Sequence, residues 1–68
     1  MKPVSGKRMC RILEQHSWTR SNIKGSHHTY RLGDPPRSVS VPVHGNRDLP
    51  TGTQKTIMRQ AGLTDDDL

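Results

Sequence analysis

The chain has 68 residues, of which 28% are hydrophobic, so we expect a single domain over residues 1–68 with a thin core. A lone cysteine excludes an internal disulfide, and the lack of a long apolar run predicts a soluble, cytoplasmic protein without a membrane contact. Eleven Lys and Arg against six Asp and Glu give a net charge of +5, which favours a polyanion such as nucleic acid, or an acidic protein, as partner.

The first expected element is an amphipathic helix over about residues 6–16. Ser5 is a good N-cap residue, and Met9, Ile12, Leu13 and His16 follow at helical spacing. Cys10 lies at the edge of this apolar stripe, where a packing role is expected rather than a reactive thiol.

Three short runs of strand-forming residues follow the helix. Tight connections at 24–26 and 33–37 separate them, which predicts an antiparallel three-stranded meander. In the third run valines alternate with Ser and Pro42, so one face of the sheet is apolar, and Pro42 belongs at a strand end or on an edge. The expected strands are 18–23, 28–32 and 38–43.

A second helix is expected over about residues 50–61. Pro50 suits the first helical position, Ile57 and Met58 belong to an apolar stripe, and Gly62 supplies a left-handed cap. The prediction is thus an α+β fold in the order α-β-β-β-α, with both helices on the valine face of the sheet. The acidic tail at 65–68 either forms a capping turn, since Thr64 and Asp67 have capping-box spacing, or frays.

Two adjacent histidines, His27 and His28, are the most conspicuous chemical feature. Neighbouring residues on a strand point to opposite faces, which argues against both binding one metal ion. A single exposed imidazole near cations could instead act as general acid or base on RNA, whose 2′-hydroxyl is an internal nucleophile. A histidine without a chemical role stays an alternative, and Trp18 and Tyr30 are expected in the core rather than stacked on bases.

Two groups of residues are candidates for contacts with phosphate. Lys24 flanks a turn in which Gly25 and Ser26 could bring backbone amides close to a phosphate. Lys55 and Arg59, four residues apart, face away from the apolar stripe of the second helix. A solvated helix face explains the second pair equally well.

Several segments together resemble the HicA (YcfA-like) toxins of bacterial and archaeal toxin-antitoxin systems. They are "SGKRMCRILEQHSW", "KGSHHTYR", "VSVPVHGNRDLPTGT" and "IMRQAGL", in family order from Ser5 to Leu63. The resemblance implies a double-stranded-RNA-binding-domain-like fold and an endoribonuclease that cleaves mRNA without a metal or cofactor. It also implies that a HicB-type antitoxin neutralises the toxin. The free toxin is then expected to be a monomer, and toxin and antitoxin together are expected to form a hetero-oligomer.

The resemblance also assigns residues. The catalytic histidine of the family matches His27, Gly25 and Ser26 match the turn before it, and His44 matches the "VPxH" position, for which we infer no firm role. Ser17 replaces a glycine common in the family, and Asn22 replaces an expected basic residue, which could weaken one phosphate contact. A non-catalytic RNA-binding module, and a role in complex assembly without RNA, remain the alternatives.

Overall fold

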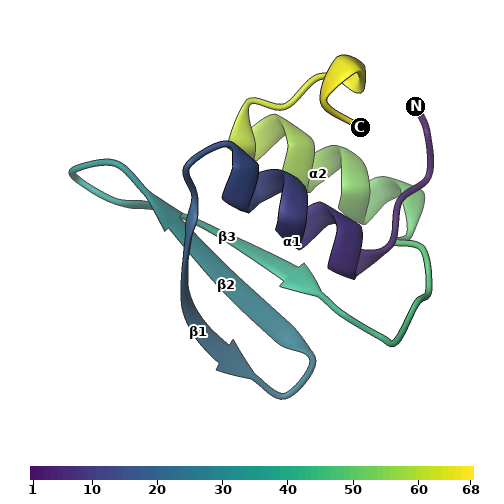
Figure 1. Cartoon of the computed structure of the whole chain (residues 1–68), viewed down its shortest axis with the longest axis horizontal. Coiled ribbons are helices and arrows are strands. Elements are labelled where there is room, and N and C mark those ends of the chain that lie inside the picture. The colour runs from purple at the N-terminus through teal and green to yellow at the C-terminus, as the bar shows by residue number, and fades with distance from the viewer.

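The computed structural model describes all residues, 1–68, and confirms the predicted order of elements. The strands form one antiparallel sheet in the order β1-β2-β3, and the two long helices lie over the same face of it (Figure 1). Each predicted helix or strand end lies within one residue of the observed one. The elements are α1 (Gly6–Gln15), β1 (Thr19–Lys24), β2 (His27–Leu32), β3 (Arg37–Pro42), α2 (Thr51–Ala61) and the 3-10 turn η1 (Asp65–Asp67).

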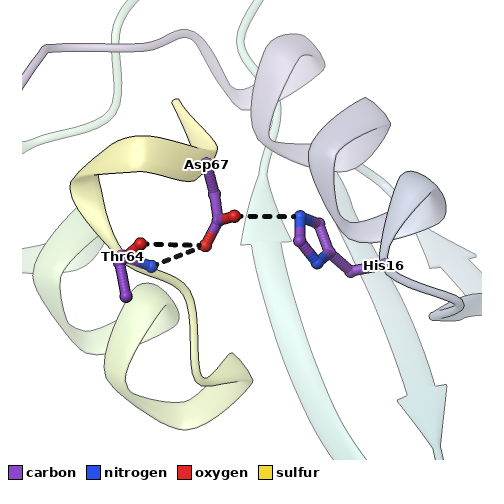
Figure 2. A network of polar contacts seen from close by, with 3 residues as sticks. All are labelled: His16, Thr64 and Asp67. Atoms are coloured by element: carbon purple, nitrogen blue, oxygen red, sulfur yellow. Dashed lines mark hydrogen bonds and ion pairs between the residues drawn. The ribbon is translucent and has the colours of Figure 1, made fainter.

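Helix α1 begins as predicted and buries most of the predicted stripe. The Ser5 hydroxyl accepts a hydrogen bond from the Arg8 N–H at 3.0 Å, which satisfies one of the free amides of the first turn. Met9, Ile12 and Leu13 are fully buried. The inclusion of His16 in that stripe was wrong: its side chain is 42% exposed, and its Nε2 lies 3.3 Å from an oxygen of Asp67 (Figure 2).

The end of α1 depends on a residue in the left-handed conformation. Ser17 has φ 73°, and it is the one non-glycine residue of the chain with positive φ. The N–H groups of Trp18 and Ser17 donate to Leu13 and Glu14 carbonyl oxygens at 3.0 and 3.2 Å, the two bonds of a Schellman cap. Gly62 closes α2 with the same backbone pattern and φ 70°, but without a Cβ.

We expect Ser17→Gly to raise the free energy of unfolding by about 1 kcal/mol. A side chain in the left-handed region costs about 1–2 kcal/mol, and the extra freedom of glycine in the unfolded chain offsets part of that gain. The midpoint of thermal unfolding should rise by about 4–8 °C. Ser38→Gly, at an exposed position of β3, is the matched control and should lower the midpoint; a Ser17→Gly protein less stable than the parent would contradict the prediction.

Alternation along β2 and β3 decides which side of the sheet the helices cover. Tyr30 pairs with Val39, and His28 pairs with Val41, so these side chains share the inner face. Tyr30, Val39 and Val41 are at most 2% exposed, which confirms the predicted apolar face. Trp18 is buried at the end of α1, as predicted, with the Arg37 guanidinium 5.5 Å above its ring. The outer face of the sheet is left open to solvent.

Helix α2 is joined to the N-terminal segment by a buried polar side chain. Gln54 is 1% exposed; its oxygen accepts from the Val4 N–H at 3.2 Å and its amide donates to the Lys2 carbonyl oxygen at 2.7 Å. Pro50 was predicted at the first helical position, but it is the N-cap residue, with extended ψ of 142°. The helix therefore begins one residue later, at Thr51.

The acidic tail forms the capping turn, the first of the two predicted alternatives. A carboxylate oxygen of Asp67 accepts from the Thr64 N–H at 2.7 Å and from its hydroxyl at 3.3 Å, while the other oxygen reaches His16 (Figure 2). Thus one aspartate closes the turn and fastens it to the end of α1. None of the helices combines the length and the apolar character that crossing a membrane requires.

Candidate functional site

The β1–β2 hairpin places Lys24 directly beside His27. The two residues are cross-strand partners, and the connection between them is the two-residue turn Gly25–Ser26. Gly25 has φ 59°, which suits the first position of a type II′ turn and which a residue with a side chain rarely adopts. Directly opposed residues have Cβ atoms about 4.5–5.5 Å apart on one face of the sheet. A cation and an imidazole are therefore neighbours at the hairpin end.

His27 and His28 lie on opposite faces, as predicted. His27 is exposed on the outer face, whereas His28 is half-buried on the inner face between its partners Ile23 and Val41. No group of three His, Cys, Asp or Glu side chains is gathered closely enough to hold a metal ion. The pair thus separates into one solvent-facing imidazole and one that is half-buried on the inner face beside Val41.

The outer face around His27 is polar and open. Along the sheet, Lys24 and Pro42 flank His27, and Asn22 and Ser40 flank Thr29 on the same face. Asn22, which replaces an expected basic residue, is consequently close to the hairpin end. A ligand with an extended backbone could lie across this face without displacing any apolar side chain.

Lys55 and Arg59 lie elsewhere, in the helix layer. Both are exposed, and they line a cavity of about 370 Å³ with residues of the two chain ends, among them Met1 and Asp65. No sheet residue lines that cavity. The structure therefore does not bring Lys55 and Arg59 together with His27, which faces solvent on the other side of the sheet.

Two titratable side chains between α1 and the sheet have raised pKa values. The Tyr30 hydroxyl donates to a Glu14 carboxylate oxygen at 2.9 Å, and burial, with its neighbours Cys10 and Glu14, raises the pKa of Tyr30 well above its ordinary range. Burial likewise raises the pKa of the Cys10 thiol. Both groups remain protonated near neutral pH, so they serve packing and hydrogen bonding.

We expect Cys10 to react slowly with a thiol reagent in the folded protein. The thiolate is the reactive form, and this side chain is 7% exposed with a raised pKa. At pH 8 the labelling rate should follow the rate of opening and become fast in urea, where the unfolded chain provides the control. Rapid, complete labelling of the native protein would contradict the assignment of Cys10 to the core.

A cavity at the end of β3 was not predicted from the sequence. Its volume is about 170 Å³, and Pro42, His44 and Arg47 line it together with Asp48, Leu49 and Pro50. His44 follows Pro42 by two residues, the spacing at which strand side chains share a face. That spacing was the available signal, but the predicted strand ended at residue 43, one residue before His44.

Comparison with protein families gives a match that spans nearly all of these elements. The family described as the HicA toxin of bacterial toxin-antitoxin systems matches residues 6–63, from the first residue of α1 to the residue after the Gly62 cap. The chain belongs to the HicA toxin family. A comparison with curated proteins gave no significant match.

Membership of the HicA family defines the general role of this chain. It is a toxin of a toxin-antitoxin system, and such a toxin implies a cognate antitoxin. The matched range contains the hairpin with Lys24 and His27, the cavity beside His44, and the exposed face of α2. All candidate site residues therefore lie within the HicA part of the chain.

Proposed function

We propose that this HicA toxin is an endoribonuclease that cleaves mRNA without a metal or cofactor and thereby inhibits translation. The observation that carries the proposal is the pairing of exposed His27 with Lys24 at the hairpin end, on an open polar face. Imidazole titrates near pH 6.5 in water, so it can accept a proton at neutral pH. It needs no metal for that step.

In the proposed reaction His27 removes the proton from a ribose 2′-hydroxyl. The 2′-oxygen then attacks the adjacent phosphorus, and negative charge develops on the phosphoryl oxygens. Lys24, directly opposite His27, offsets that charge. A positioned general base contributes about 10²- to 10⁴-fold to the rate, and the cation adds to this by stabilising the transition state.

Gly25 and Ser26 complete the proposed phosphate contact. Nothing lies within 4 Å of the position that a Cβ on Gly25 would occupy, so the turn is open to a ligand. The Ser26 carbonyl oxygen accepts from the Val43 N–H at 2.7 Å, which holds the turn against the chain after β3. A fixed turn keeps its backbone amides in place for a phosphate.

Lys55 and Arg59 are proposed to contact RNA away from the cleaved bond. Because they lie in the helix layer, they would bind phosphates of a part of the RNA that His27 does not reach. They would add to the affinity for RNA, which falls as the salt concentration rises, and would not add to the rate of cleavage. A HicB-type antitoxin would neutralise the toxin by covering the outer face, and an acidic partner suits a chain of net charge +5.

The proposal is tested with purified protein and a structured mRNA in EDTA. We expect cleavage, with 2′,3′-cyclic phosphate and 5′-hydroxyl ends, and no cleavage of the same sequence carrying 2′-O-methyl groups. Binding without cleavage would overturn the enzymatic proposal and leave a non-catalytic RNA-binding module. Cleavage that is lost in EDTA and restored by zinc would overturn metal independence, and addition of the antitoxin should abolish cleavage.

A further inference from the structure

The chain beyond β3 continues along the β1–β2 turn. Pro42 is the cross-strand partner of His27, and the next residue, Val43, donates its N–H to the Ser26 carbonyl oxygen at 2.7 Å. Val43 also packs against the core, so its side chain lies on the inner side. Pro42 and His44 line the same cavity, so His44 lies beside the residue that pairs with His27.

His44 lines a cavity that the cationic side chain of Arg47 also lines. The cavity at the end of β3, about 170 Å³ in volume, is lined by His44, Arg47 and Asp48 besides its apolar walls. The Arg47 N–H donates to the His44 carbonyl oxygen at 3.1 Å, so one tight turn presents both side chains. Since one water occupies about 30 Å³ in the liquid, the cavity has room for a phosphate group.

Cleavage by a 2′-hydroxyl needs two proton transfers, not one. The O2′–P bond forms and the P–O5′ bond breaks; a base takes the proton from O2′, and an acid must supply one to the departing O5′. His27 provides only the first group. The imidazole of His44, beside the Pro42 that pairs with His27, has the chemistry of the second.

We propose that His44 is the general acid of this reaction and that Arg47 binds the phosphate on the 3′ side of the cleaved bond. The proposal rests on the endoribonuclease function proposed above. His44 gives its proton to O5′ as His27 takes one from O2′, so the proton count balances, and exchange with water restores both residues. The charged groups facing this region are Arg47 and Asp48 in the cavity and Lys24 opposite His27.

The decisive experiment uses two RNA substrates that differ in one atom. In the second substrate sulfur replaces the 5′-bridging oxygen at the cleavage site, and a thiolate leaves without being protonated. His44→Ala should cleave the ordinary substrate about 10²- to 10⁴-fold more slowly than the parent, but the sulfur substrate at close to the parental rate. His27→Ala should remain slow on both, because sulfur does not replace the base.

The outcomes separate this inference from the function on which it rests. If the parent cleaves neither substrate, the endoribonuclease proposal fails. If His27→Ala is slow while His44→Ala cleaves the ordinary substrate at the parental rate, the enzyme stands and the assignment of His44 is wrong. If His44→Ala cleaves both substrates more slowly than the parent by the same factor, His44 is not the general acid. His16→Ala, whose imidazole contacts Asp67 at 3.3 Å, is the control and should cleave both as the parent does.

Discussion

His27→Ala is expected to lower the rate of RNA cleavage by about 10²- to 10⁴-fold, the usual contribution of one general base. Its side chain is exposed on the outer face, where truncation removes no core contact. Folding should therefore be unchanged, and RNA binding should weaken little because Lys24 remains. Single-turnover cleavage at saturating protein measures the rate, and filter binding measures the affinity.

The neighbouring histidine provides the matched control. His28→Ala removes the same imidazole from the inner face, and its cleavage rate should stay within a few-fold of the parent when both proteins are folded. Lys24→Met should reduce both the cleavage rate and the affinity for RNA. The plot of the logarithm of the binding constant against the logarithm of salt concentration should become less steep by about one, the contribution of one phosphate contact. A His27→Ala protein as active as the parent, or a His28→Ala protein that is folded and inactive, would exclude His27 as the base.

Gly6→Ala is expected to destabilise the fold by about 1–3 kcal/mol. A Cβ at Gly6 would overlap the Pro42 carbonyl oxygen and approach the Val43 Cα to 3.1 Å, and neither is the flexible end of a side chain. Helix α1 would have to move away from the end of β3, which positions Val43 against the Ser26 turn. A domain of this size seldom exceeds about 3–5 kcal/mol of stability, so the loss is a large fraction. Thermal unfolding followed by circular dichroism should show a midpoint lower by about 4–8 °C for each kcal/mol.

Gly52 is the control for this substitution, because it is also a helical glycine. Nothing lies within 4 Å of a Cβ built on Gly52, so Gly52→Ala should gain about 0.5–1 kcal/mol from helix propensity alone. If Gly6→Ala destabilises the protein while Gly52→Ala stabilises it, the loss of stability at Gly6 comes from the contact with β3. Stabilisation by Gly6→Ala would show that α1 and β3 are not packed as closely as described.

The sequence determined the elements, because local chemistry and periodicity act over a few residues. Ser5 and Gly62 marked helix ends, alternating valines marked β3, and the Gly25–Ser26 turn marked the hairpin. The alternation of strand side chains also separated His27 from His28 without any knowledge of the fold. The assignment of His27 to catalysis came from the family resemblance and stays a prediction.

Only the tertiary structure decided what lies beside what, since contacts between distant residues depend on how elements pack. Periodicity placed His16 in the apolar stripe of α1, but in the folded protein its imidazole contacts Asp67 of the C-terminal turn. It placed Lys55 and Arg59 on an exposed helix face, but could not show that this face is remote from His27. The cavity beside His44 was likewise not predicted, because it forms where Val43 bonds to the Ser26 turn and the following loop lies against Pro42.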